Sequence, residues 1–213
     1  MKKIFSLSIL LSFFLISKSQ DTIRLKHKSY EAVFSKSLKY PVLVEWWVTK
    51  AKVTCANPVP RKDAFKPDPL LMNETNLLDD YKGSGLDRGH NSPAADNQCE
   101  GELIQAECFY FSNMTPQYHS LNAGDWKVLE MSTREWALTD DSIKVWCGSI
   151  GIEKKIGGVC VPKECWKVLY FKKTKIWMAF LFKNTKDKPS GLKSHEVDLK
   201  TITELTGYKF SSN

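Results

Sequence analysis

Runs of apolar side chains separated by polar turns dominate the middle and the end of the chain. Residues 42–49 (VLVEWWVT) and 143–150 (IKVWCGSI) are rich in β-branched and aromatic side chains, which favour strands. Two further runs, at 165–173 and 175–183, meet at a Lys-Thr-Lys turn, and a shorter run covers 109–111. The pattern predicts a mainly antiparallel sheet in which the two late runs form a hairpin.

Helical signals are fewer than strand signals. A helical pattern extends over 122–137, and a second over 199–206, where Asp198 is placed as an N-cap and Gly207 as a stop. Residues 63–81 are polar and rich in Pro, Asn and Asp, which predicts a long ordered loop. The expected fold class is therefore α+β, an antiparallel sheet with packed helices.

The helix at 122–137 combines an apolar side with polar residues along its edge. Asn122 stands at its start, where an N-cap belongs. Glu130 and Arg134 lie on the edge of the apolar side, one turn apart and able to pair. Such a polar series is what a site between a helix and a sheet would need. The residues that share the apolar side are Trp126, Leu129, Thr133 and Trp136.

The first 19 residues have the pattern of a secretory signal peptide. Lys2 and Lys3 precede an apolar run at 4–16, and a small-residue cleavage site follows. The run is too short to span a bilayer, and no later stretch of about 18 apolar residues appears. We expect removal of residues 1–19, one domain at 20–213, a secreted or periplasmic location and no membrane partner. A buried N-terminal helix is the alternative.

Charge changes this picture little. Loss of the three lysines in segment 1–19 lowers the formal net charge from +7 to +4. A mildly basic domain can bind a polyanion, but many soluble domains carry a similar charge. The composition permits a nucleic acid partner without demanding one.

The cysteines favour an oxidising compartment. An even number of cysteines behind a signal peptide is typical of disulfides, and three are expected. Cys99 and Cys108 are the first choice for one local pair. No Cys-x-x-Cys pair occurs, so structural zinc is disfavoured. The six cysteines are Cys55, Cys99, Cys108, Cys147, Cys160 and Cys165.

Candidate chemistry centres on the motif DRGH at 87–90. A neutral imidazole can accept a proton from water near pH 7, although an isolated histidine is more often a structural residue. Gly89 would let the backbone approach a neighbour closely, or adopt a conformation closed to other residues. Outside the motif, His27, His119 and His195 are expected to be structural.

Several segments together resemble the DNA/RNA non-specific endonuclease family. They are LDRGHNSPAADN at 86–97, FYFSNMTPQYHSLNAGDWKVLE at 109–130, Arg134, VPKECWKVLY at 161–170 and ITELTGYKF at 202–210. Together they extend over nearly the whole chain after segment 1–19. The resemblance implies a ββα-metal catalytic core, as in secreted sugar-non-specific nucleases and mitochondrial endonuclease G.

The resemblance also implies a role for each matching residue. His90 would be the general base. Asn122 would be the sole direct protein ligand of Mg²⁺, with Mn²⁺ as a substitute, because a neutral amide suits an ion that keeps most of its waters. Glu130 would hold metal-bound waters, and Asp87 would do the same or brace the motif. Asn113, expected at the end of a strand, would orient His90 or a metal water.

Arginine side chains would contact the scissile phosphate. Arg88 and Arg134 match the family pattern, and a guanidinium fork fits phosphate oxygens. Some secreted members carry a further substrate-binding arginine just ahead of an aromatic residue in the preceding loop. Asp63 occupies that place here, so Arg61, or Lys62, would supply the contact.

The expected function is hydrolysis of phosphodiester bonds in DNA and RNA. His90 would deprotonate a water that attacks phosphorus in line, while Mg²⁺ on Asn122 stabilises the transition state and the departing 3′ oxygen. The products would carry 5′-phosphates, without sugar or strong sequence specificity. The expected partners are DNA and RNA as substrates and a second copy in a homodimer. The alternative is a nucleic-acid-binding or uptake protein on a nuclease scaffold that has lost turnover.

Overall fold

The computed structural model of the protein describes residues 21–71, 74–75 and 77–212. The expected signal peptide at 1–19 lies outside the described residues. The domain is therefore described from just after that segment to one residue before the end of the sequence.

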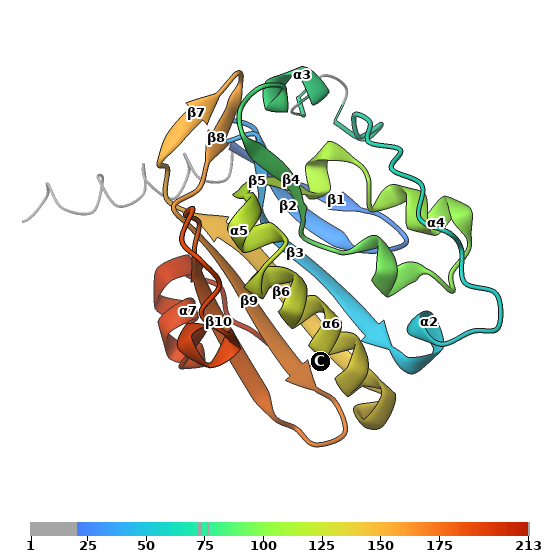
Figure 1. Ribbon diagram of the computed structural model, residues 1–213. Coiled ribbons are helices and arrows are strands. Elements are labelled where there is room, and N and C mark those ends of the chain that lie inside the picture. Colours follow the sequence, from blue (N-terminus) through green and yellow to red (C-terminus); the bar gives the residue numbers. More distant parts are fainter. Residues whose placement is uncertain (1–20, 72–73, 76, 213) are drawn as a thin grey trace, which may run out of the picture.

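A seven-stranded antiparallel sheet forms the centre of the fold (Figure 1). The four predicted long runs are strands β3, β6, β9 and β10, and β9 and β10 form the predicted hairpin. Two strands at the start of the described chain, β1 and β2, extend one edge and were not predicted from the pattern. In spatial order the strands are β1 (Thr22–Lys26), β2 (Glu31–Ser35), β3 (Tyr40–Thr49), β6 (Ser142–Ile150), β9 (Glu164–Phe171), β10 (Trp177–Lys183) and β11 (Glu196–Val197).

Two small hairpin-like sheets and several helices complete the domain. The two-stranded sheets pair β4 (Leu86–His90) with β5 (Met114–Tyr118) and β7 (Lys154–Ile156) with β8 (Val159–Val161). The α-helices are α2 (Lys50–Val53), α3 (Leu78–Tyr81), α4 (Glu102–Glu107), α5 (His119–Asn122), α6 (Asp125–Asp140) and α7 (Leu199–Thr206). Single 3₁₀ turns are η1 (Ala94–Asn97), η2 (Phe111–Asn113) and η3 (Leu192–His195). In the part of the chain that the structure describes, no helix is long and apolar enough to cross a membrane.

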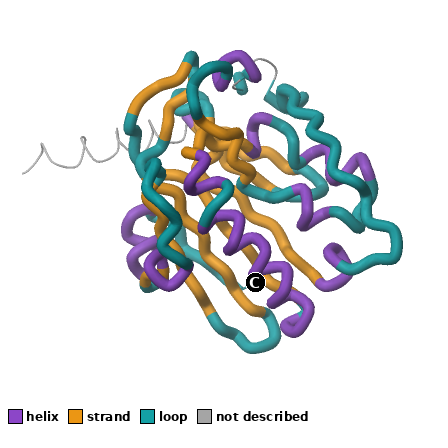
Figure 2. Tube along the Cα trace, in the orientation of Figure 1, coloured by secondary structure: helices purple, strands orange, loops and turns teal. Residues whose placement is uncertain are grey.

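Both faces of the central sheet carry a hydrophobic core. On the face crossed by α6, Leu129 belongs to the same cluster as Val145 of β6 (Figures 1 and 2). On the opposite face, Ile202 of α7 belongs to a cluster with Trp146 of β6 and Trp166 of β9. Neighbouring residues of β6 thus point into different cores, as the two-residue period of a strand requires. The expected α+β class with helices packed on an antiparallel sheet is confirmed.

The helix predicted at 122–137 is in fact two helices. The short α5 ends at Asn122, and α6 begins at Asp125. Gly124 lies at the junction, where an added Cβ would be 2.1 Å from the carbonyl oxygen of Ser120. Because that contact is with backbone, a larger residue would force the two helices apart. Asn122 therefore closes α5 and is not the N-cap of the long helix.

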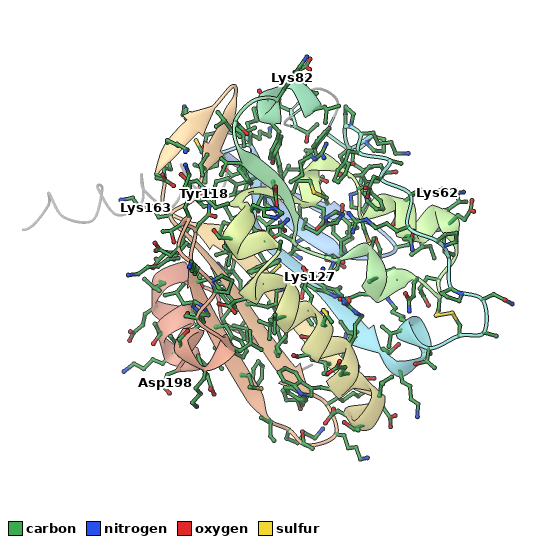
Figure 3. All side chains as sticks on the ribbon, in the orientation of Figure 1. Lys62, Lys82, Tyr118, Lys127, Lys163 and Asp198 are labelled. Atoms are coloured by element: carbon green, nitrogen blue, oxygen red, sulfur yellow. A yellow bond between two sulfur atoms is a disulfide. The ribbon has the colours of Figure 1, made fainter. Side chains whose placement is uncertain are left out.

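The cysteine pairing differs from the prediction. The structure contains one disulfide, Cys55–Cys99, which ties the loop after α2 to the chain after η1 and is the yellow bond beside α2 in Figure 3. The expected three disulfides, and the pair Cys99–Cys108, are wrong. Cys108 instead packs against Asn97, whose Nδ2 lies 3.4 Å from its sulfur. The other free cysteines, all buried, are Cys147, Cys160 and Cys165.

Candidate active site

The DRGH motif forms the strand β4, and this strand pairs along its length with β5. β5 leads directly into α5, so two strands and a helix follow one another as the ββα core requires. Gly89 is needed for a close approach: a Cβ at this position would lie 2.0 Å from Oε1 of Gln117. The backbone of the motif therefore sits directly against a buried side chain of the partner strand.

Asp87 joins the motif to the end of α5. Its Oδ2 accepts a hydrogen bond from Nδ2 of Asn122 at 2.8 Å. The same oxygen lies 2.8 Å from Nδ1 of His119. Asp87 on β4 and Asn122 on α5, which are predicted to share one site, are thus in direct contact. This contact fits the bracing role, which is one of the two roles expected of Asp87.

A cavity of about 540 Å³ opens beside this contact. Lys82 lies on the wall of this cavity, and Figure 3 shows this lysine beside α3 at the edge of the molecule. The cavity therefore brings basic side chains, together with the acidic Asp63, Asp79 and Asp87, to β4 and the end of α5. Four of the predicted site residues line it: Arg61, Asp87, Arg88 and Asn122.

An irregular arm at 54–68 forms another wall of the cavity through Phe65. The guanidinium of Arg88 lies over the Phe65 ring, 4.1 Å from its centroid. Arg61 lies 5.3 Å from the centroid of Phe109 and bonds Asp63, with Nε and Oδ1 2.7 Å apart. Aromatic faces hold both guanidinium groups by cation–π contact. Arg61 also keeps Asp63 as an ion-pair partner, so only part of its guanidinium edge is open to an anion.

His90 lies beneath this aromatic layer. It is 8% exposed, and its ring meets Phe109 edge to face with centroids 5.1 Å apart. Burial, together with the positive charges of Arg61 and Arg88, lowers the pKa of His90 to about 3. The imidazole is therefore neutral at pH 7. Within the described chain its buried Nε2 has no hydrogen-bond partner, so this nitrogen can accept a proton.

The long helix α6 holds the backbone of the motif. Nε1 of Trp126 donates a hydrogen bond to the carbonyl oxygen of His90 at 3.0 Å. Trp126 is almost completely buried, so this bond is shielded from water. The position of the imidazole therefore depends on the packing of α6 against the sheet.

Asn113 lies just before β5, at the end of the turn η2, and does not end a strand as expected. Its Oδ1 accepts from the backbone N–H of Ser92 at 2.9 Å, and its Nδ2 donates to the carbonyl oxygens of Ser92 and Cys108, both at 2.8 Å. The fully buried side chain thus clamps the chain two residues after His90. Its expected influence on His90 would act through this backbone.

Glu130 and Arg134 do not pair with each other as proposed from their spacing. Oε1 of Glu130 lies 3.9 Å from Nζ of Lys167 on β9. Nη1 of Arg134 donates to Oδ1 of Asp96 at 2.9 Å, and Oδ2 of Asp96 accepts from Nε1 of Trp46 at 2.8 Å. Each residue therefore has a buried partner from another element. Neither lines the 540 Å³ cavity, and Arg134 borders a hollow beside α2 instead.

The donor set at the rim of the cavity fits a hard divalent cation. Asn122 gives its amide N–H to Asp87, and no group in the described chain donates to its Oδ1. Amide and carboxylate oxygens are the ligands that Mg²⁺ accepts. Among the described residues, no three His, Cys, Asp or Glu side chains cluster as a metal site. The fit therefore rests on Asn122 with Asp87 behind it.

Sequence reasoning missed several residues of this region. His119 was expected to be structural, yet it shares Asp87 with Asn122. Phe65 supports Arg88, and Lys167 is the partner of Glu130. Only the spacing of His119, three residues before Asn122, offered a signal. Lys167 and Asp96 are brought in by folding of distant segments.

The chain matches known proteins over nearly its whole length. Residues 14–213 match the family model of the DNA/RNA non-specific endonucleases. The mitochondrial nuclease EXOG of Mus musculus is 45% identical over 83 residues, which make up 38% of this chain and 22% of that protein. A protein named Nuclease from Nostoc sp. is 31% identical over 172 residues, covering 72% of this chain and 61% of that protein. The matches span only 22% to 34% of the length of the EXOG relatives.

A solved structure has the same fold. A crystal structure of the EndoG/EndoGI complex, which concerns the inhibition of EndoG, superposes with a TM-score of 0.80 at 24% identity. The superposition covers 88% of this chain and 84% of that chain, so the fold is shared. The family is named for endonucleases, which is the enzyme class expected from the DRGH motif. The chain belongs to the DNA/RNA non-specific endonuclease family, as its motifs predict.

Proposed function

We propose that this protein is a Mg²⁺-dependent endonuclease that cuts DNA and RNA and leaves 5′-phosphates. The observation that carries the proposal is the 2.8 Å bond from Asn122 to Asp87. It joins the motif strand to the end of α5 beside a cavity that Arg61 and Arg88 also line. A neutral histidine, an amide oxygen and two guanidinium groups are the functional groups that phosphodiester hydrolysis needs.

His90 would act as the general base. Its imidazole is neutral at pH 7 because burial lowers its pKa to about 3. The free Nε2 can take a proton from the attacking water while the Trp126 bond keeps the motif backbone in place. General-base catalysis of this kind contributes typically about 10²–10⁴-fold.

Asn122 would hold the cation through Oδ1, with Asp87 fixing the amide orientation. When bound, Mg²⁺ would supply charge that stabilises the transition state and the leaving oxygen, and Mn²⁺ would substitute for it. Glu130 would accept hydrogen bonds from the hydration shell of the ion, as the family resemblance implies. These three residues all lie on or between β4, α5 and α6.

Arg88 and Arg61 would bind the substrate phosphates, since both guanidinium groups face the cavity on aromatic supports. Arg134 would contribute at a distance, because one edge of its guanidinium is bonded to Asp96. Contacts with phosphate carry no base or sugar information. We therefore propose that the protein cuts both DNA and RNA, and that activity weakens as salt rises.

Plasmid nicking with and without EDTA tests the proposal. Nicking that requires a divalent ion and returns with Mg²⁺ would support the nuclease. Tight binding of plasmid without nicking at any Mg²⁺ or Mn²⁺ concentration would favour the alternative, a nucleic-acid-binding or uptake protein without turnover. RNA and DNA of equal length should be compared at one salt concentration. Cleavage of only one of them would contradict the lack of sugar specificity.

We propose that the protein is secreted or periplasmic, with residues 1–19 removed. The disulfide Cys55–Cys99 supports an oxidising compartment, because such bonds are rare where thiols are kept reduced. Several relatives are named as mitochondrial nucleases, which makes a mitochondrial location the competing outcome. N-terminal sequencing of the protein from fractionated cells separates the two. The proposed homodimer is measured by light scattering on the same sample.

A further inference from the structure

Lys167 is a buried lysine to which the proposed catalytic mechanism assigns no role. It lies on β9, a central strand of the sheet, and is 1% exposed. Burial of an ammonium group is costly unless an opposite charge or a polarisable surface compensates it. Its partners therefore indicate why the fold keeps a charge in this place.

We propose that Lys167 is a positioning residue that fixes the carboxylate of Glu130 and favours its negatively charged form. The inference rests on the proposed function, in which Glu130 faces the hydration shell of the cation. It assigns to β9, a strand of the central sheet, a part in organising the site.

The geometry carries the proposal. Nζ of Lys167 lies 3.9 Å from the centroid of the Trp126 ring and 5.8 Å from that of Trp46. The same atom lies 3.9 Å from Oε1 of Glu130. Two indole faces and one carboxylate thus enclose the ammonium. Trp126 and Glu130 are four residues apart on α6, so both project from the same side of the helix.

Lys167 is linked to the base as well as to Glu130. The Trp126 ring that faces the ammonium also donates its N–H to the carbonyl oxygen of His90 at 3.0 Å. One buried charge therefore contacts the ring that holds the DRGH strand and the carboxylate proposed to face the ion. Movement of Lys167 would disturb two parts of the site together.

The charges around Glu130 come from four elements. Lys167 faces it from β9, Asp96 from η1, Arg134 from its own helix and Cys147 from β6. Burial raises the pKa of Glu130 to about 7, and Lys167 is the largest influence that lowers it. Without Lys167 the carboxylate would stay protonated at neutral pH. A protonated Glu130 could no longer accept hydrogen bonds with both oxygens.

An NMR titration of the Glu130 carboxyl carbon in the full domain tests the charge effect without any cleavage. Lys167→Met should move the midpoint upward by on the order of 1–3 pH units, the usual influence of an opposite charge at this distance. Lys167→Arg, which keeps the charge, should leave most of the wild-type value. Where Lys167→Met lowers the thermal midpoint strongly, Lys167→Gln repeats the measurement. An unchanged Glu130 midpoint without the lysine charge would overturn the proposal.

A double-mutant cycle tests whether Lys167 acts through Glu130. The acid limb of the pH–rate profile should move to higher pH in Lys167→Met. In a Glu130→Gln background, where no carboxylate remains to be held, the same substitution should have little further effect. Lys127→Met is the matched control, because Lys127 is an exposed lysine of α6, seen in Figure 3, and should change neither profile. Equal losses in both backgrounds would show a merely structural role.

The two proposals can fail separately. A wild-type protein that does not nick plasmid, but whose Glu130 midpoint rises in Lys167→Met, would refute the nuclease and keep the electrostatic pairing. A protein that cleaves but shows no movement of that midpoint would keep the nuclease and refute the role of Lys167.

Discussion

The cavity side of the site and the cluster beneath α6 are built in opposite ways. Asn122 lines the cavity with a carbonyl oxygen to which no described group donates, and His90, beneath the aromatic layer, has a ring nitrogen without a partner in the described chain. Beneath α6, Glu130 and Arg134 each face a buried partner of opposite charge. A buried polar atom without a partner, such as Nε2 of His90, is costly in a folded protein, so it is expected where a ligand will supply the missing contact. The paired cluster holds α6 in place, and the position of the DRGH strand depends on that helix.

The largest expected effect comes from the base. His90→Ala should lower single-turnover cleavage by about 10²–10⁴-fold, because general-base catalysis is lost. The thermal midpoint should also fall, because the buried ring packs against Phe109, so cleavage is measured well below that midpoint. His195→Ala, on η3 and outside the residues that line the cavity, is the control for histidine removal and should retain cleavage. Full activity of His90→Ala would place the base elsewhere.

The paired cluster should show the reverse behaviour, a stability loss. Asp96→Ala leaves the guanidinium of Arg134 and the indole N–H of Trp46 without their partner. Breaking a buried ion pair by removing one member costs about 3–5 kcal/mol, and the partial exposure of Arg134 favours the lower end. Urea unfolding measures the loss. Glu31→Ala, from the exposed pair with Arg24, should cost at most about 1 kcal/mol. Similar losses in both variants would remove the distinction between the two regions.

Gly89 tests the contact between the two strands of the site. Gly89→Ala should destabilise the domain by about 1–3 kcal/mol, because its Cβ would overlap Gln117, which is buried and cannot turn outward freely. Gly158→Ala is the control, since a Cβ there meets nothing closer than 3.6 Å. Differential scanning calorimetry of both variants is sufficient. Equal midpoints would mean that Gln117 moves aside at no cost.

The contributions of His90 and Glu130 to the pH dependence of stability should have opposite signs. The pKa of His90 is about 3 in the folded protein and about 6.5 unfolded, so the unfolded state binds more protons between these values. Stability should therefore fall with falling pH in that window, by at most about 1.4 kcal/mol per pH unit. His90→Gln should flatten this slope.

Glu130 should contribute with the opposite sign. Its pKa is raised to about 7 from 4.5, so the folded state holds the extra proton and stability falls as pH rises through this range. Glu130→Gln should flatten that part of the curve. Chemical denaturation at a series of pH values gives both slopes, and slopes of equal sign would contradict the assignment.

The sequence patterns predicted the elements that are apolar enough to be buried. β3, β6, β9 and β10 are long runs of β-branched and aromatic residues, and all four appear. β1 and β2, five residues each and only partly buried, lack such a run and were missed. The break at Gly124 was also missed, because helical periodicity continues across it. At Gly124 the backbone leaves the helical conformation (φ −97°, ψ −123°), and an added Cβ would lie against the carbonyl oxygen of Ser120.

The candidate site was predicted in its motif residues and not in their supports. Asp87 and Asn122 were expected in one site and touch each other. Lys167 and Asp96 lie in other segments, and no local pattern relates them to Glu130 or Arg134. The disulfide pairing is hard to predict for the same reason, because Cys99 is nearer in sequence to Cys108 than to its partner Cys55. Pairings between distant segments follow from packing, which a local pattern does not contain.

Single-turnover cleavage against Mg²⁺ concentration, in four proteins, tests the central claim most directly. The proteins are the wild type, His90→Ala, Asn122→Ala and the double variant. Excess Mg²⁺ should partly restore Asn122→Ala, which has lost a ligand, and should not restore His90→Ala. The two losses should be less than additive, because base and ligand act on one transition state. Restoration of His90→Ala by Mg²⁺, with none for Asn122→Ala, would contradict the assignment of base and metal ligand.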